Sequence, residues 1–317
     1  MPYNKLTPVI DSKETDLSGF DAAIPDTHYR LINENGTFNI EREGNVASSL
    51  FAQSLTMSWT KFIGYALLFY FSINGLFALG FMFIGVESIT NLNPGTWFQE
   101  FIQYLFFCIE TFTTVGYGHN SPNGTAANIL ASFVSFVGLL SFAIATGLSY
   151  AKFSRPTSDI KFSKNMLIAP NKNGEKSLQF RIVNTNNNHI FDMEARVTLA
   201  WLENVDGRLR RRFKWLDLEI ENIHLFPLNW TIVHPINSES PLFDLDKQDM
   251  ATSRMEILIL IKGFDATYTK TIHSKHSYNC INLIENAQFI PMYKNKNGRT
   301  VLDLSQLNSY EEYSFKK

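Results

Sequence analysis

The stretch Thr113-Thr114-Val115-Gly116-Tyr117-Gly118 decides the expected fold because of what lies on either side of it. Residues 62–85 read FIGYALLFYFSINGLFALGFMFIG and contain no charge. Residues 129–153 read ILASFVSFVGLLSFAIATGLSYAKF and contain one charge, Lys152, near the end, where a lysine can reach the membrane interface. A helix of either length extends roughly 36 Å, enough to cross a hydrocarbon core of about 30 Å. The two runs therefore predict two membrane spans.

The segment just before the quoted stretch is apolar but too short to span a membrane. Residues 96–112 begin near Trp97 and hold two carboxylates, Glu100 and Glu110. As a helix this segment would reach only about 25 Å. It is better interpreted as a re-entrant helix that enters the membrane and turns back, so we expect a pore helix and a following loop over residues 96–118.

The five residues Thr114, Val115, Gly116, Tyr117 and Gly118 are a strong candidate for an ion site. Irregular backbone at membrane depth is tolerated only where it lines a cavity. The two glycines permit conformations closed to other residues and can turn successive carbonyl groups toward one axis. Four copies would form rings of carbonyl oxygens and Thr114 hydroxyls that replace the water around K⁺. This predicts a selectivity filter that binds K⁺ at residues 114–117 in a homotetramer. The context of span, short helix, motif and span argues against an accidental loop.

The basic residues set the expected orientation. No Lys or Arg occurs between residues 62 and 151, whereas Lys61 precedes the first run and Lys152 and Arg155 follow the second. The positive-inside rule then places both termini in the cytoplasm and the 86–125 loop outside. The first residues contain no apolar run, so we expect no cleaved secretory signal. We predict a multi-pass protein of the cell (inner) membrane.

The flanking parts of the chain have a different character. Apolar residues recur at helical spacing from Val46 to Trp59, which predicts an amphipathic helix on the inner membrane face, or alternatively a helix packed on a cytoplasmic domain. After Pro156 come short β-type runs such as SLQFRIV (177–183) and MEILILIK (255–262), typical of a β-sandwich. The expected domains are a cytoplasmic N-terminal segment at 1–45, a membrane pore domain at 46–155 and a cytoplasmic sandwich at 156–317.

Composition excludes several function classes. Basic and acidic residues nearly balance at 28 and 30, so no nucleic-acid partner is expected. The two cysteines are too few for a disulfide-stapled secreted fold. No GxGxxG motif follows a predicted strand, and no hydrolytic or redox constellation is present. We therefore expect no enzyme activity and no cofactor, with K⁺ as the permeant ion only.

The chain resembles the inward rectifier potassium channels, especially the prokaryotic members, over roughly residues 28–293. The span, pore helix, TVGYG and span order is shared by potassium channels, and the cytoplasmic part narrows the resemblance. It is carried by AKFSRP (151–156), WTIVHP (230–235), SPLFD (240–244) and HSY (276–278), with RLIN (30–33) and NGTFN (35–39) similar to the family's N-terminal strand. The resemblance implies a two-span pore domain with a re-entrant pore helix and a slide helix near 46–59, plus an immunoglobulin-like cytoplasmic β-sandwich that extends the pore.

The resemblance also implies roles for particular residues. Glu110 is expected to support the filter from behind, although His119 stands where its usual partner would be. Phe142, Thr146 and Tyr150 fall at four-residue spacing on the pore-lining face, where ordinary helix packing is the alternative. Phe142 takes the place of an acid found in strong rectifiers, and Tyr150 that of an aromatic constriction. Asp265 aligns with a carboxylate of the cytoplasmic pore.

Together these observations predict a passive K⁺ channel gated from its cytoplasmic side, independent of voltage and weakly rectifying. Lys61, Lys152 and Arg155 remain from the family's lipid-binding residues and are candidate contacts for membrane lipids, including anionic ones. Cytoplasmic Mg²⁺ and polyamines are expected to block weakly. Two alternatives are a subunit of a K⁺ uptake transporter, which needs four pore loops in one chain, and a membrane-anchored binding or signalling protein, which leaves TVGYG unexplained.

Overall fold

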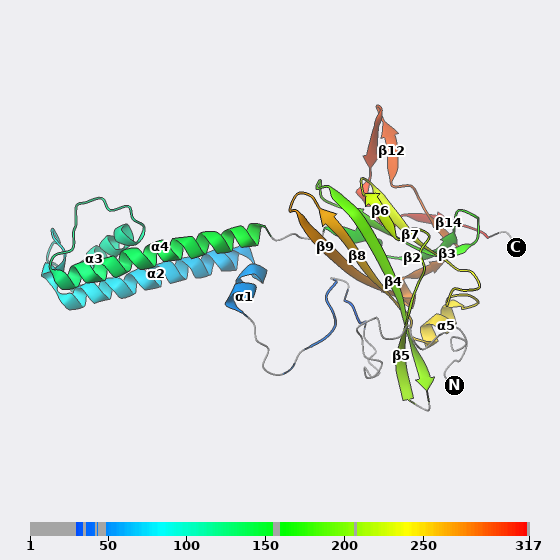
Figure 1. Cartoon of the computed structure of the whole chain (residues 1–317), viewed down its shortest axis with the longest axis horizontal. Helices are drawn as coiled ribbons and strands as arrows, with labels where there is room; N and C mark the ends of the chain where they lie inside the picture. The colour runs from blue at the N-terminus through cyan, green and yellow to red at the C-terminus, as the bar shows by residue number, and fades with distance from the viewer. Residues whose placement is uncertain are drawn as a thin grey trace. The chain divides into compact units, whose positions relative to one another are not determined.

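A computed structural model describes residues 30–33, 36–41, 43, 49–154, 159–205 and 208–315. The chain divides into two compact units, drawn in Figure 1. One unit, Gly44–Arg155, is helical. The other combines Met1–Glu43 with Pro156–Lys317 and is built mainly of strands. The N-terminal segment therefore belongs to the same unit as the expected sandwich.

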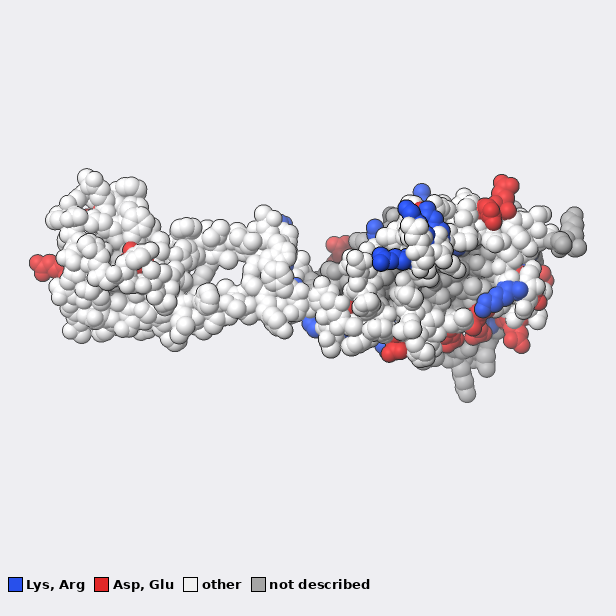
Figure 2. Space-filling view, turned by 90° about the horizontal axis from the view of Figure 1, so that it is seen from above, with Lys and Arg blue, Asp and Glu red and all other residues white. Residues whose placement is uncertain are grey.

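The helical unit contains two long helices and two short ones. They are α1 (Leu50–Thr56), α2 (Trp59–Ile84), α3 (Trp97–Phe112) and α4 (Thr125–Phe153), with a 3₁₀ turn, η3 (Val86–Ser88), after α2. The α2 and α4 helices have mean hydropathies of 2.0 and 2.2 and are long enough to cross a membrane. The α4 helix contains the expected span 129–153, and α2 contains all of the expected span 62–85 except Gly85, which caps its C-terminal end. Figure 2 shows this unit with almost no Lys or Arg on the visible surface.

The amphipathic helix expected at 46–59 is shorter in the structure. It covers only Leu50–Thr56, because Met57 and Ser58 have extended backbone, and Trp59 already begins α2. The Ser49 hydroxyl accepts a hydrogen bond from the Ala52 N–H and starts α1. The α1 helix contacts α4 within the helical unit. The Val46 end of the expected helix lies outside the described residues.

The α3 helix is held between the two long helices by an aromatic core. Phe81 of α2 lies 5.2 Å from Phe107 in an edge-to-face contact, and the Tyr104 hydroxyl donates to the Gly85 carbonyl at 3.0 Å. Small residues of α4, Ala127 and Ala131, are buried against this core. These contacts fix where α3 ends, and that end positions the quoted TVGYG stretch.

The strand unit is a sandwich of two five-stranded sheets. One sheet has the order β1-β3-β2-β10 with β7 on the other edge of β3, and the second has the order β5-β4-β8-β9 with β6 paired to β4. All pairs are antiparallel except β2 with β10. The strands of the two sheets are β1 (Ile160–Phe162), β2 (Met166–Pro170), β3 (Lys176–Asn184), β4 (Ile190–Val205), β5 (Arg208–Trp215), β6 (Asn222–Leu225), β7 (Asn229–Pro235), β8 (Glu256–Asp265), β9 (Lys270–Asn279) and β10 (Leu283–Glu285).

The sandwich closes its own core. Inward-facing side chains from both sheets, including Ile182, Trp201, Ile232 and Ile259, form one buried cluster. Smaller elements complete the unit, namely α5 (Lys247–Thr252), η4 (Cys280–Asn282), β11 (Ala287–Phe289), β12 (Tyr293–Lys296), β13 (Arg299–Leu302), η5 (Leu304–Asn308) and β14 (Tyr310–Glu312).

Residues Leu31 and Ile32 of the N-terminal segment are hydrogen-bonded to the second sheet. The N–H of Leu31 lies 3.0 Å from both oxygens of the buried Glu256 carboxylate, and the Ser277 hydroxyl donates to the Ile32 carbonyl at 2.9 Å. Arg211 balances the charge of Glu256 at 3.5 Å. Ile32 also pairs with Phe38 in an isolated bridge, in place of the longer strand that the resemblance implied at 30–39.

Candidate functional site

The backbone of the TVGYG stretch alternates in conformation. Thr114, Gly116 and Gly118 have positive φ values of 60°, 50° and 77°, while Val115 and Tyr117 between them are not in this region. In a regular strand successive carbonyls point to opposite sides, and alternating the sign of φ turns them toward the same side instead. Positive φ is unusual for a threonine, so the stretch has a specified conformation rather than that of an ordinary loop. It can present several carbonyl oxygens to one ligand.

The stretch directly follows the C-terminal end of α3 and is hydrogen-bonded to it. The Glu110 carbonyl accepts hydrogen bonds from the N–H groups of Val115 (3.0 Å) and Gly116 (3.2 Å). These bonds direct the N–H groups of the stretch back toward the helix, which leaves its carbonyls free for an ion. Within the described part of the chain the Glu110 carboxylate makes no hydrogen bond, to His119 or elsewhere. Glu110 therefore holds the stretch through its backbone carbonyl, and support of the filter by its side chain stays a prediction.

The segment after the stretch is tied to the loop that precedes α3. The Thr90 N–H donates to the Ser121 carbonyl at 2.9 Å, and the Asn91 side-chain amide donates to the His119 carbonyl at 2.7 Å. The Asn123 N–H likewise donates to the Ser88 carbonyl at 2.8 Å. The TVGYG stretch is thus anchored at both ends, by α3 on one side and by residues 88–91 on the other.

Gly138 is a close-contact position on α4. A Cβ added there would collide with the carbonyl group of Phe112, whose carbon would lie 2.9 Å away. Only glycine lets α4 approach the end of α3 so closely. A glycine in a long helix can be a hinge or a close-contact position, and at Gly138 the structure shows a close contact. Nothing lies within 4 Å of a Cβ at Gly147.

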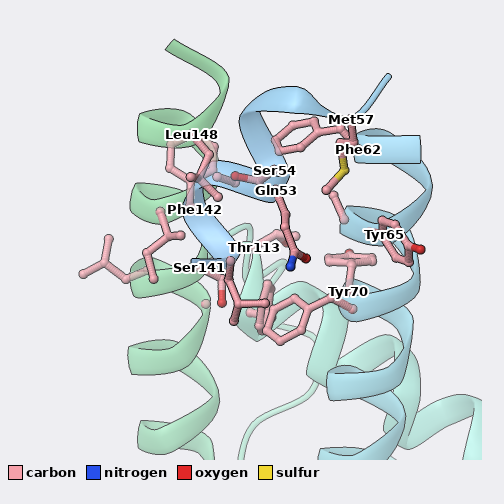
Figure 3. A pocket seen from close by; sticks show the side chains of 18 of the residues that line it. Gln53, Ser54, Met57, Phe62, Tyr65, Tyr70, Thr113, Ser141, Phe142 and Leu148 are labelled. Carbon is pink, nitrogen blue, oxygen red and sulfur yellow. The ribbon is translucent and has the colours of Figure 1, made fainter. Parts of the chain in front are cut away.

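A cavity of about 960 Å³ lies next to the C-terminal end of α3 within the helical unit. Figure 3 shows side chains around it from α1 (Gln53), α2 (Tyr70) and α4 (Phe142), together with Thr113 at the end of α3. Thr114 also lines it, so the first residue of the TVGYG stretch and Phe142 border the same cavity. The lining is mostly apolar and has no charged side chain.

The three α4 residues expected to line a pore are not packed within the chain. Phe142 and Tyr150 are 75% and 73% exposed, and Thr146 between them is also exposed. Residues four apart lie on one face of a helix, so these three form a continuous strip. Packing inside a single chain, the alternative left open by the sequence, does not account for them.

The basic residues near the membrane boundary have different surroundings. Lys61 is exposed on the first turn of α2. Lys152, expected to reach the lipid interface, is only 9% exposed, and its ammonium group donates to backbone carbonyls at the end of α1. Arg155 lies outside the described residues. The structure therefore separates two lysines that the sequence grouped together.

Asp265 does not present its carboxylate to solvent. It is fully buried, and one oxygen accepts from the N–H groups of Thr267 (2.8 Å) and Tyr268 (3.3 Å) while the other accepts from the Asn188 amide (2.5 Å). A tight turn leaves N–H groups without partners, and this carboxylate satisfies them. In the single chain the Asp265 side chain therefore holds the turn between β8 and β9, and its expected role as a carboxylate of the cytoplasmic pore stays a prediction.

The sandwich brings together one Ser–His pair that sequence reasoning had not noticed. His234 Nε2 lies 2.8 Å from the Ser240 hydroxyl, and Nδ1 lies 2.6 Å from the Asp217 carbonyl. Burial lowers the pKa of His234, so the neutral ring donates from Nδ1 and accepts from Ser240 at Nε2. Both residues are buried in the sandwich, where the Ser240 hydroxyl also accepts from the Leu242 N–H. The pair holds the WTIVHP and SPLFD segments together.

Comparison with known proteins fits this arrangement. Residues 46–154 match a family model described as "Ion channel", and residues 160–316 match the inward rectifier potassium channel C-terminal domain. The inward rectifier potassium channel Kirbac3.1 of Paramagnetospirillum magnetotacticum is 32% identical over 88% of this chain and 95% of its own length.

The chain belongs to the inward rectifier potassium channel family. Two further relatives are the ATP-sensitive inward rectifier potassium channel 12 of Gallus gallus, 24% identical over 89% of this chain and 72% of its own, and the G protein-activated inward rectifier potassium channel 1 of Homo sapiens, 25% identical over 88% and 60%. The predicted family and fold class are confirmed. The family is one of transmembrane ion channels rather than enzymes.

Proposed function

We propose that four copies of this chain form a K⁺-selective pore in which residues 114–118 are the filter and K⁺ binds at residues 114–117. The observation that carries this proposal is the alternation of φ along the stretch, with its N–H groups turned back to Glu110. Carbonyls directed to one side can replace a hydration shell only if several strands surround the ion. One chain supplies one strand, so a fourfold homotetramer completes the site.

The same pore continues along α4 past Phe142, Thr146 and Tyr150. The exposure of this strip in the single chain and the presence of both Thr114 and Phe142 in the lining of one cavity support that path. Four Tyr150 rings near the cytoplasmic end would form an apolar constriction that gates by excluding water, without a voltage sensor. Conduction is then passive. Because Phe142 carries no charge, cytoplasmic Mg²⁺ and polyamines block weakly and rectification is weak.

The chain is placed in the cell (inner) membrane with both termini in the cytoplasm. Residues 46–155 form the membrane pore domain, 1–45 the cytoplasmic N-terminal segment and 156–317 the cytoplasmic sandwich. This assignment rests on the two uncharged helices and on the basic residues that flank them. Exposed Lys61 is the contact for membrane lipids that the described residues support best, and anionic headgroups suit its charge.

The test is uptake of radioactive Rb⁺ into liposomes that contain only the purified protein. We expect uptake that needs no energy source, is blocked by Ba²⁺ and excludes Na⁺. Energy-dependent uptake would indicate a transporter, and the absence of flux from folded tetramers in several lipid compositions would contradict the proposal. The molecular mass of the assembly in detergent should equal four chains.

A further inference from the structure

Lys152 lies on the penultimate position of α4 and is the only basic residue in the last turn of that helix. Its Nζ atom donates to three backbone carbonyls, those of Ser54 (3.3 Å), Leu55 (3.4 Å) and Met57. An ammonium group has three N–H donors and no acceptor. The three carbonyls therefore use all of its hydrogen-bonding capacity, and none remains for a lipid phosphate.

The three carbonyls belong to the C-terminal end of α1. The last carbonyls of any helix lack partners within the helix and carry the negative end of its dipole. The α1 helix has no basic residue of its own in its last turn. Lys152 supplies the missing cation from a helix roughly a hundred residues further along the chain.

The α1 helix is short and largely exposed. It has only seven residues, and none of its side chains is buried. A helix this short is not stable in isolation, so its position depends on tertiary contacts. The Lys152 ammonium also lies 5.3 Å and 5.8 Å from the ring centroids of Trp59 and Phe62, which start α2. Trp59 in turn contacts Phe153, the last residue of α4, with ring centroids 4.4 Å apart.

We infer that Lys152 is a positioning residue that fastens the end of α1 to the cytoplasmic end of α4, two residues from Tyr150. The orientation of α1 then sets the position of the constriction, because the two elements share one attachment. The conduction part of this inference rests on the proposed function, whereas the attachment itself does not. It assigns to Lys152 a role different from the lipid contact expected from the sequence.

The attachment can be tested by hydrogen exchange on the full-length protein in liposomes. We expect Lys152→Met to increase amide exchange in residues 51–57 by at least about tenfold, because the α1 carbonyls lose their cap. Exchange in the middle of α4 should stay unchanged. The matched control is Lys61→Met, which removes an exposed lysine at the same end of the helical unit and should leave α1 protected. Unchanged α1 exchange in Lys152→Met would overturn the inference.

Rb⁺ flux in two lipid compositions separates attachment from lipid binding. In neutral and in anionic liposomes we expect Lys152→Met to change the resting flux several-fold and by the same factor. A lipid contact would instead reduce the response to anionic lipid while α1 stayed protected, and this result would overturn the inference. A loosened α1 with wild-type flux would also overturn it. If the wild-type protein carried no flux, the proposed function would fail while the exchange experiment still decided the attachment.

Lys152→Arg provides a second variant if Lys152→Met does not assemble. Its guanidinium keeps the positive charge that a lipid phosphate needs, but its planar donors cannot reach three carbonyls grouped around one atom. Capping therefore predicts a partial increase in α1 exchange, in the range of a few-fold. The opposite outcome has two parts: α1 of Lys152→Arg exchanges as in the wild type, and only variants without a positive charge at position 152 lose the response to anionic lipid. That outcome would make Lys152 a lipid contact.

Discussion

The two units of this chain differ in how far their large apolar side chains are buried. The sandwich buries its large apolar residues between two sheets, and Ile182, Ile232 and Ile261 have no exposed surface. The long helices leave most of theirs uncovered, including Leu68, Phe71, Leu76, Phe133, Phe136 and Leu139. An exposed apolar surface of this extent needs lipid or other chains to cover it. The difference teaches that the sandwich forms a buried core within one copy, whereas the apolar surface of the long helices is left for lipid or other chains to cover.

The largest effect is expected where the helical unit depends on assembly most directly, in the filter. Gly116→Ala should abolish K⁺-over-Na⁺ selectivity or conduction while the tetramer remains intact. Nothing lies within 4 Å of a Cβ at this position, so the change acts through the backbone. An alanine at φ 50° costs about 1–2 kcal/mol and tends to turn the neighbouring carbonyls away. Rb⁺ and Na⁺ flux measure the result.

Gly64→Ala is the matched control for Gly116→Ala. Gly64 lies in α2 with open space around a Cβ and without positive φ. Its replacement should leave selectivity at the wild-type value. Normal K⁺ selectivity in Gly116→Ala would show that the filter assignment is wrong.

A pair of core and surface substitutions tests the comparison itself. Ile232→Ala should lower the free energy of unfolding of the sandwich by about 2–5 kcal/mol, because it opens a cavity in a closed core. Leu76→Ala on α2 should leave that transition unchanged, since Leu76 is exposed in the helical unit and stays in the membrane when the sandwich unfolds. Thermal unfolding of both variants measures the shift. Equal shifts would mean that the two units do not unfold separately.

An acid placed in the proposed pore should create a blocker site. In the proposed tetramer Phe142→Asp puts four carboxylates around the pore, where the low dielectric strengthens their attraction for a polyamine. We expect cytoplasmic spermine to block at least about tenfold more tightly, against weak and shallowly voltage-dependent block in the wild type. Current recordings across a range of spermine concentrations measure this, with Phe142→Asn as the uncharged control. Tight, steeply voltage-dependent block of the wild type would refute weak rectification.

The proposed constriction at Tyr150 can be opened by truncation. Tyr150→Ala removes four rings, which should widen and wet the pore and raise the resting Rb⁺ flux several-fold. Tyr150→Phe keeps the rings and should behave as the wild type. The comparison requires equal amounts of protein in the liposomes. Unchanged flux in Tyr150→Ala would place the gate elsewhere, for example at the turn after Asp265.

Much of this architecture could be predicted from the sequence because the signals are local. Length and absence of charge identify α2 and α4, and the β-type runs identify the sandwich strands. The TVGYG motif identified the stretch at the end of α3, although not the positive φ of Thr114, since threonine seldom adopts it. Local patterns reveal which elements form.

The rest depended on contacts between residues far apart in the sequence. Nothing near Lys152 indicates that its ammonium meets carbonyls almost a hundred residues upstream, so a lysine at a helix end was expected to reach for lipid. The family resemblance indicated a carboxylate at Asp265 but not where its oxygens point. Their orientation is set by the N–H groups of the turn, to which they are hydrogen-bonded. The sequence also does not show that Gly138 lies so close to the Phe112 carbonyl that a Cβ would not fit.

The smallest effect is expected from the buried His234 of the sandwich. Its pKa is lowered mainly by burial and also by Lys214, while the Asp217 carbonyl and carboxylate act in the opposite sense. The unfolded chain therefore binds a proton at His234 at a higher pH than the folded chain does. Its contribution to stability is complete above the unfolded pKa of about 6.5 and is lost as the pH falls below that value.

The measurement is the melting temperature of the sandwich at pH 7.5 and at pH 5.5. Wild-type protein should melt at a lower temperature at pH 5.5, and His234→Gln should show a smaller difference because it has no proton to gain at this site. The exposed His224, paired with Asp192 at 3.0 Å, offers the matched control. His224→Gln keeps the buried ring and should retain most of the pH dependence. If both variants lost it equally, burial of His234 would not be its source.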